Sequence, residues 1–163
     1  MNYSKELSTT AERQFAHSSH VSQLTKILAR RAGYSQENIK LLMDAAALHD
    51  IGKQQLPLSV LNKNGYLTES EFMLIKTHAY IGSVALLKKA RLMVLAAIIA
   101  EQHHEKLDGS GYAEIKNIHE SAKLVAVADI FDALISERAY KKAWSPYKIM
   151  EYMEEKKRQR AGC

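Results

Sequence analysis

Cysteine and long apolar runs are what this sequence most clearly lacks. Its only cysteine is Cys163, the last of 163 residues, so a disulfide scaffold and a cysteine-based metal site within one chain are excluded. No apolar run approaches the about 18 residues that a transmembrane helix needs, and residues 1–10 lack the apolar segment of a signal peptide. The sequence therefore predicts a cytoplasmic protein without a membrane span.

Proline, glycine and strand patterns are also scarce. The chain has two prolines, Pro57 and Pro146, and seven glycines, so helices are interrupted in few places. No alternating run of β-branched residues is bounded by turn pairs, which is the usual mark of a strand. Because 47% of the residues are hydrophobic, a chain of this length can bury one core of ordinary size. These features predict a single all-α domain.

The positive charge of the chain is confined to its end. Residues 1–137 carry 15 basic and 15 acidic residues, whereas residues 138–163 carry eight basic and three acidic ones and so hold the whole net charge of +5. A basic face across the domain, which nucleic-acid binding needs, is not supported. No nucleic-acid partner is therefore expected, and the basic end is interpreted as a solvated helix end.

Apolar residues recur at helical spacing along most of the chain. The apolar segments are residues 21–28, 39–47, 81–87, 92–99 and 122–135. Ser35 is a candidate N-cap, Thr68 and Glu71 form a capping box for a helix through about residue 76, and Ser145 with Pro146 opens a last helix. Longer loops are predicted at residues 52–65 and 108–118.

Histidines and aspartates gather at the ends of the predicted helices. They are His17 on the first helix, His49–Asp50 at the end of the second helical run, His78 at the end of the helix begun at Thr68, and His103–His104 at the end of the next. Asp129 instead lies inside an apolar helix, where a half-buried carboxylate needs a partner. His119 fits no such spacing and is interpreted as a surface residue. His20, one helical turn after His17, is left open.

This mixture of side chains is typical of a site for transition metals. Imidazole and carboxylate together suit iron, manganese or zinc. Two metals about 3.5–4 Å apart can activate a water and clamp the oxygens of a phosphate ester. A carboxylate can bridge two metals, and Asp50 is the natural candidate. One metal would take His17, His49, Asp50 and Asp129, and the other Asp50, His78, His103 and His104.

Four motifs follow one another in an order that resembles a known family. They are HDIGK at residues 49–53, LTESEFMLIKTH at 67–78, HHEKLDGSGY at 103–112 and VADIFDALISERAYKKA at 127–143. Together they resemble the HD-GYP branch of the HD superfamily of metal-dependent phosphohydrolases, whose members hydrolyse cyclic di-GMP. The resemblance covers residues 13–150, which leaves residues 1–12 as a lead-in and 151–163 as the basic end of a C-terminal helix.

The resemblance implies a fold, an activity and a set of site residues. The fold is a compact bundle of about five to seven helices, and the activity is hydrolysis of cyclic di-GMP to pGpG, and further to GMP, by a hydroxide activated between two metals. The implied ligands are His17, His49, Asp50, His78, His103, His104 and Asp129. Catalysis is assigned to Asp50 and Lys53, and substrate contacts to Lys53, Tyr112, Asp132, Arg138 and Lys141. The implied cofactors are two divalent ions, with iron or manganese favoured and other transition metals open.

The chain departs from the family pattern in several places. Ala113 stands where the Gly-Tyr-Pro signature has proline, which predicts a freer loop, and the segment 113–122 is shorter than usual. Arg13 replaces a glutamate that is associated with a third metal, which favours two metals, and His20 replaces an arginine. The chain also ends soon after its last helix begins, as an excised domain would.

These departures keep two other functions open. One is a cyclic di-GMP-binding or signalling module with impaired catalysis, in which the loop Gly111-Tyr112-Ala113 offers a surface for a protein partner. The other is an HD hydrolase that acts on another nucleotide phosphoester.

Overall fold

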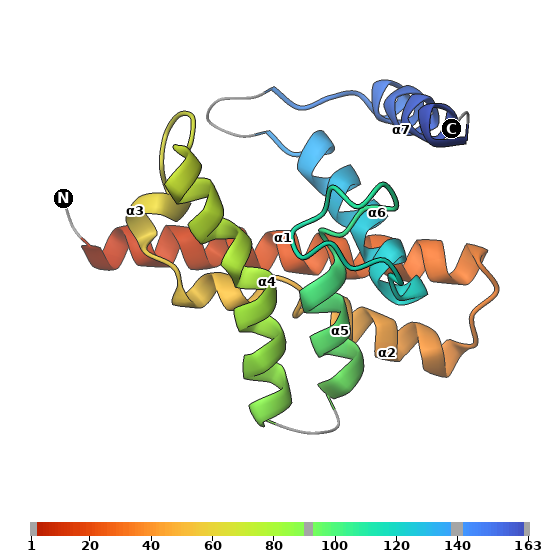
Figure 1. Ribbon diagram of the computed structural model, residues 1–163, viewed down its shortest axis with the longest axis horizontal. Helices are drawn as coiled ribbons and strands as arrows, with labels where there is room; N and C mark the ends of the chain where they lie inside the picture. Colours follow the sequence, from red (N-terminus) through yellow and green to blue (C-terminus); the bar gives the residue numbers. More distant parts are fainter. Residues whose placement is uncertain (1–2, 90–92, 138–141, 162–163) are drawn as a thin grey trace.

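The computed structural model describes residues 3–89, 93–137 and 142–161. Every regular element in these residues is helical (Figure 1). The elements are α1 (Tyr3–Arg31), α2 (Gln36–Ala46), the 3₁₀ helix η1 (Ile51–Gln55), α3 (Leu58–Leu61), α4 (Glu69–Lys89), α5 (Val94–Gln102), α6 (Glu120–Ile135) and α7 (Pro146–Ala161). With seven α-helices in the described residues, the prediction of an all-α bundle is confirmed.

Helices α1 and α2 form an antiparallel pair along one side of the molecule (Figure 1). The turn between them passes through Gly33, whose φ of +82° lies in the left-handed region that favours glycine. Ser35 then caps α2, because its Oγ accepts a hydrogen bond from the backbone N–H of Asn38 at 3.2 Å, as predicted. Helix α1 begins at Tyr3, so the expected lead-in is largely helical.

Helix α4 is longer than the sequence predicts. Its start has the predicted capping box, in which Glu71 N–H donates to Thr68 Oγ1 (3.2 Å) and Thr68 N–H donates to Glu71 Oε2 (2.7 Å). The helix then runs through His78 to Lys89, so the prediction that His78 ends a helix is wrong. Residues 81–87 continue the same helix, since a single glycine such as Gly82 costs a helix only about 1 kcal/mol.

The predicted loop at residues 52–65 contains the short helices η1 and α3. Elements of five and four residues are too short to show a helical period in the sequence, which is why they were missed. A Cβ on Gly52 would lie 2.0 Å from the carbonyl oxygen of His78, and one on Gly82 would lie 3.1 Å from Gly52 N. Glycine at both positions lets the chain just after Asp50 lie directly against the helix that carries His78.

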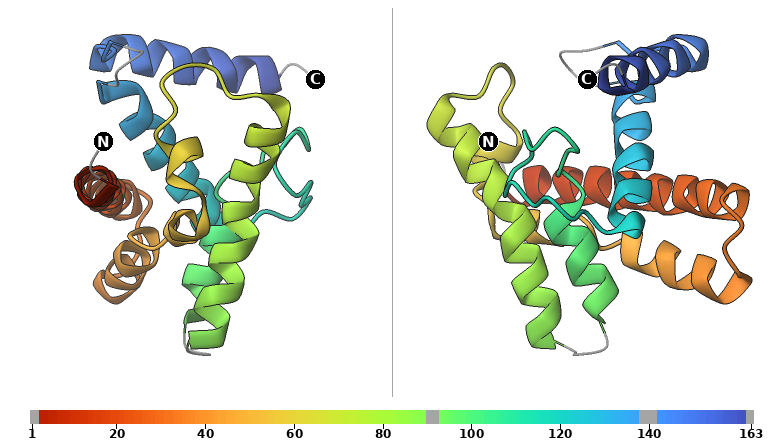
Figure 2. Two further views of the ribbon diagram at one scale, coloured as in Figure 1. Left: turned by 90° about the vertical axis from the view of Figure 1, so that its left-hand side faces the viewer. Right: turned by 45° about the vertical axis from the view of Figure 1, so that its right-hand side comes forward.

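The core lies where α1, α2, α5 and α6 meet. Helix α6 packs across α1 and α5, and α5 also contacts α2 and α4 (Figure 2). Leu42, Ile99 and Val125 are among the largest fully buried side chains there. This core holds the elements around the site at fixed angles.

His119 is exposed at the start of α6, where its Nδ1 accepts from Ser121 N–H at 3.2 Å, so the surface interpretation is confirmed.

Helix α7 packs mainly on α6, at one end of the bundle (Figures 1 and 2). Ser145 Oγ accepts from Lys148 N–H at 3.3 Å, as its predicted capping role requires, and Ile149 is fully buried.

Arg138 and Lys141, which the resemblance assigns to substrate, lie outside the described residues. In the part of the chain that the structure describes, no helix has both the length and the apolar character to cross a membrane.

Candidate metal centre

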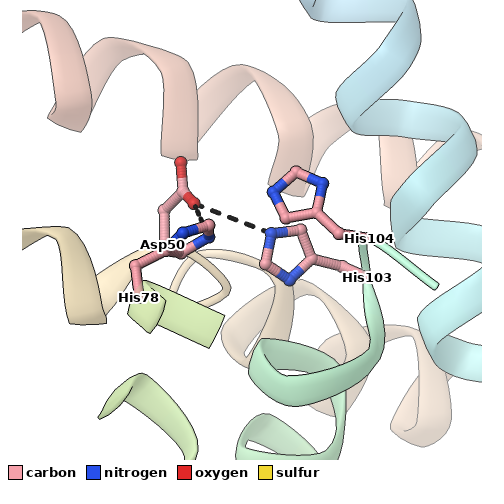
Figure 3. A group of neighbouring side chains, drawn as sticks. All are labelled: Asp50, His78, His103 and His104. Atoms are coloured by element: carbon pink, nitrogen blue, oxygen red, sulfur yellow. Dashed lines mark ion pairs between the residues drawn. The ribbon is translucent and has the colours of Figure 1, made fainter. Parts of the chain in front are cut away.

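The fold brings together all seven of the side chains that the sequence nominates as ligands. His17 comes from α1, His49 and Asp50 from the segment between α2 and η1, His78 from the middle of α4, His103 and His104 from the end of α5, and Asp129 from α6. Figure 3 shows Asp50 facing His78 and His103, with His104 beside them. Five segments that are far apart in the sequence therefore meet at one point.

Three buried histidines present the same ring nitrogen to this point. The Nδ1–H groups of His49, His78 and His103 donate to backbone carbonyl oxygens one helical turn earlier. The acceptors are the oxygens of Ala46 (2.7 Å), Ile75 (2.6 Å) and Ala100 (3.0 Å). Because a carbonyl oxygen only accepts, each Nδ1 must carry the proton, and each Nε2 keeps a lone pair that faces the centre.

These inward-facing atoms have no hydrogen-bond partner. The Nε2 atoms of His49, His78 and His103 and the Oδ1 of Asp50 are all buried and unbonded among the described residues. Asp50 Oδ1 lies 3.2 Å from His78 Nε2 and 3.6 Å from His103 Nε2, so these atoms converge on one point. Leaving such groups unsatisfied costs about 1–3 kcal/mol each. A cation between them removes this cost, and the donor set therefore fits a metal.

Asp50 is shared between two groups of ligand atoms. Its Oδ1 belongs with His78, His103 and His104, and the other group contains Asp50, His17 and His49. A third group contains His49, His103 and Asp129. Within each group, the atoms that could bind a metal lie within 4.8 Å of one another. This sharing is what a carboxylate bridge between two metals requires.

Burial keeps two of the imidazoles, His49 and His104, neutral. It lowers the pKa of His49 to about 4 and that of His104 to about 2, so both are unprotonated at neutral pH, as metal ligands must be. Burial would raise the pKa of Asp50, but the ammonium of Lys53 holds it well below its usual range. Asp129 stays ionised in the same way, because its bond with His17 outweighs its burial and lowers its pKa.

His17 differs from the other imidazoles. Burial would lower its pKa, yet its bonds with Asp129 and Asp132 raise it to about 9. Its Nδ1 donates to Asp132 Oδ2 at 2.7 Å, and its Nε2 lies 3.2 Å from Asp129 and 3.6 Å from Asp50. A metal ion bound by Nε2 would replace the proton on that atom. The Nδ1–H group would keep its hydrogen bond to Asp132.

Asp132 lies against His17 and His20. It is 4% exposed and accepts hydrogen bonds from His17 at 2.7 Å and His20 at 3.2 Å. A carboxylate behind a metal-binding imidazole fixes the orientation of the ring and makes the ring nitrogen a better ligand. Asp132 thus orients His17, and the question left open for His20 is answered: it faces Asp132, with its side chain 62% exposed.

Lys53 and Tyr112 contact different members of the cluster. Lys53 Nζ forms an ion pair with Asp50 Oδ2 and borders the two cavities beside the centre. Tyr112 is half-buried, and its ring stacks on His104 with the centroids 4.3 Å apart. The ring of Phe72 meets the Tyr112 ring edge-on, with the centroids 6.1 Å apart. Tyr112 therefore covers the His104 side of the centre, and Lys53 borders the open side.

Glu105 is the residue whose role the sequence analysis missed. This carboxylate is 7% exposed and accepts three backbone hydrogen bonds, from Tyr112 (2.9 Å), Ala113 (2.8 Å) and Ile115 (2.8 Å). A Cβ on Gly111 would lie 2.6 Å from Glu105 Oε2, so glycine is needed there for close approach. The sequence did hold a signal for this role. Glu105 is an acidic residue directly after two candidate ligands and just before a glycine-rich loop.

The expectation that Ala113 loosens its loop is corrected by these bonds. Proline has no backbone N–H and could not make the bond from position 113 to Glu105. Alanine supplies that donor. The loop is therefore held by a buried carboxylate where the family signature relies on a proline ring.

Comparisons with known proteins agree with this geometry. The HD domain family model matches residues 3–162. The cyclic di-GMP phosphodiesterase response regulator RpfG of Xanthomonas campestris is 42% identical over 137 residues, which cover 82% of this chain and 36% of RpfG. The 3'3'-cGAMP-specific phosphodiesterase 2 of Vibrio cholerae is 38% identical over 140 residues, covering 83% of this chain and 27% of that protein.

A solved structure supports the same assignment. Bd1817, an HDG"Y"P protein from Bdellovibrio bacteriovorus, matches with a TM-score of 0.66 and 28% identity, over 75% of this chain and 41% of Bd1817. The chain spans about a third of the length of the two curated relatives described above. The chain belongs to the HD domain family, and its resemblance to the HD-GYP branch is confirmed.

Proposed function

We propose that residues 13–150 form a metal-dependent phosphodiesterase that hydrolyses cyclic di-GMP to pGpG, and further to GMP. The observation that carries this proposal is the set of buried, unbonded Nε2 and Oδ1 atoms that converge on one point. Relatives at 42% and 38% identity carry the names of cyclic-dinucleotide phosphodiesterases, which supports the substrate class. The cytoplasmic location stays a prediction, as does a protein partner for the Gly111-Tyr112-Ala113 loop.

Seven side chains would hold the two metals. They are His17, His49, Asp50, His78, His103, His104 and Asp129. Iron and manganese are the preferred ions, because the donors are imidazoles and carboxylates without thiolate. Two divalent ions bound there supply an activated water and neutralise charge on the phosphate oxygens. The chain contributes three imidazoles whose Nδ1 atoms are held by backbone carbonyl oxygens, and two carboxylates that stay ionised despite burial.

Lys53 is a cation that the described part of the chain places at Asp50, beside the proposed position of the reacting phosphate. Its ammonium touches Asp50 and borders the cavities on the open side, where it would offset the charge that develops on a phosphate oxygen. We further propose that Arg138 and Lys141 contact the substrate, on the strength of the resemblance alone. Tyr112, stacked on His104, would limit the access of water on the His104 side.

Hydrolysis of 3'3'-cGAMP is the second candidate function. Its support is specific: the Vibrio cholerae relative at 38% identity is named for that substrate. Both cyclic dinucleotides have two phosphodiester linkages and differ in one base, so the metal centre serves either of them. The choice between them would depend on contacts to the base.

Product analysis tests the proposed function. The purified protein, loaded with Mn²⁺ or anaerobically with Fe²⁺, is expected to release pGpG from cyclic di-GMP, as followed by chromatography. The same assay with 3'3'-cGAMP ranks the two substrates. Tight binding of cyclic di-GMP without turnover in either loaded form would instead identify a binding module. Turnover of neither cyclic dinucleotide, together with hydrolysis of another nucleotide ester, would identify a different hydrolase.

A further inference from the structure

A cavity of about 520 Å³ opens beside the metal centre, a volume within the range of small-molecule sites. Its lining includes His17, Asp50 and Lys53 of the centre, together with residues 60–65 and Arg13 on α1. Arg13 lies one helical turn before His17 and is therefore on the same face of α1. A ligand with one end at the metals would extend past Arg13.

The guanidinium of Arg13 is held in place by neutral acceptors. Its Nη2 donates to Asn62 Oδ1 at 3.0 Å, and its Nε donates to the carbonyl oxygen of Thr9 at 3.2 Å. Asn62 Oδ1 also accepts from Thr10 Oγ1 at 2.8 Å, which fixes the acceptor itself. A guanidinium has five N–H donors, so two fixed bonds orient it and leave donors for an anion.

The charge of Arg13 is not used by the protein itself. Among the described residues, no carboxylate lies within ion-pair distance of its guanidinium, whereas Lys53 pairs with Asp50 and Lys63 pairs with Glu71. Glu137 also borders the cavity but makes no ion pair with Arg13. Arg13 is thus a fixed, exposed cation that borders the same cavity as the candidate ligands His17 and Asp50.

We propose that Arg13 forms a second phosphate subsite, which binds the linkage that is not being cleaved. The inference rests on the proposed function, because a cyclic dinucleotide has two phosphodiester groups and only one can react at Asp50 at a time. A guanidinium binds phosphate through two parallel N–H bonds. Arg13 would therefore favour substrates with two phosphates over simple diesters with one, and would act on binding rather than on the chemical step.

The test compares two substrates in the variant Arg13→Gln. With cyclic di-GMP, KM is expected to rise about tenfold or more, since a bond to a charged group contributes about 1.5–3 kcal/mol, while kcat stays within about twofold. With bis(p-nitrophenyl) phosphate, which has one phosphate, both constants are expected to match those of the unmodified protein. Arg13→Lys keeps the positive charge but not the paired N–H donors of the guanidinium. Its KM for cyclic di-GMP should lie between that of the unmodified protein and that of Arg13→Gln. Arg30→Gln, an exposed change at the far end of α1, is the matched control.

A binding measurement that does not depend on turnover completes the test. Calorimetry with the metal-loaded protein and pGpG, supplied as an analogue whose internal linkage is a phosphorothioate that resists hydrolysis, should give a Kd that is weaker by a similar factor in Arg13→Gln, with the metal content unchanged. The subsite would be overturned if Arg13→Gln lowered the activity on both substrates equally. It would also be overturned if the KM for cyclic di-GMP and the Kd for pGpG were both unchanged. A protein that cleaves bis(p-nitrophenyl) phosphate but no cyclic dinucleotide would contradict the proposed function, and the pGpG titration would still decide on Arg13.

Discussion

Asp50→Ala is expected to lose both metals together and to lower phosphodiesterase activity by a factor of about a thousand or more. The two oxygens of Asp50 face different imidazoles, with His78 3.2 Å from Oδ1 and His49 3.5 Å from Oδ2. Removing the carboxylate therefore takes a ligand from two groups at once. It also removes the negative charge that offsets two divalent cations. Elemental analysis of the purified variant measures the effect directly.

Two further variants make this result interpretable. Asp50→Asn keeps the size of the side chain, so metal loss in a variant that remains folded would come from the missing charge rather than from a cavity. His119→Ala removes an imidazole that caps α6 and is not among the candidate ligands. This change should leave the metal content unchanged and lower the stability modestly. One metal at full occupancy in Asp50→Ala would show that Asp50 does not bridge.

Glu105→Ala is expected to lower the free energy of unfolding by about 3–5 kcal/mol. Three backbone N–H groups would lose their acceptor together, and each unsatisfied donor costs about 1–3 kcal/mol. The stack of Tyr112 on His104 depends on the same loop. We therefore also expect faster hydrogen exchange in residues 106–118 and weaker binding of the metal that His104 would hold.

A graded series tests this role of Glu105. In Glu105→Gln one carbonyl oxygen remains, which can keep the bonds from Tyr112 and Ala113 that now end on Oε1 but not the one from Ile115 on Oε2. Its loss of stability should be intermediate. Glu120→Ala removes an exposed partner of Lys123 and should cost less than about 1 kcal/mol. Unchanged exchange in residues 106–118 in Glu105→Ala would contradict the role given to Glu105.

The candidate ligands could be nominated from the sequence because most of them lie in a recognisable local setting. His49–Asp50 and His103–His104 are paired residues at helix ends, and Asp129 is a carboxylate inside an apolar helix. Such signals are local in the chain, and the fold then brings them together. His78 lies in the cluster, but its helix runs on to Lys89 and does not end at His78 as predicted, since the single glycine Gly82 does not interrupt it.

The contacts of Asp132 and Arg13 join residues that are distant in the sequence. Asp132 bonds to His17 across 115 positions, and Arg13 bonds to Asn62 across 49. Local sequence patterns carry no information on such pairs, so Asp132 was assigned to substrate on resemblance alone. Glu105 is nearer to its partners, but they are backbone N–H groups, which have no signature in the sequence.

Binding of Mn²⁺ to the metal-free protein, followed by elemental analysis and electron paramagnetic resonance, tests the two-metal centre most directly. Two ions per chain are expected to bind. Their signals should be spin-coupled, because both ions share the carboxylate of Asp50. A single ion per chain, or two ions with uncoupled signals, would contradict a centre in which Asp50 joins two metals.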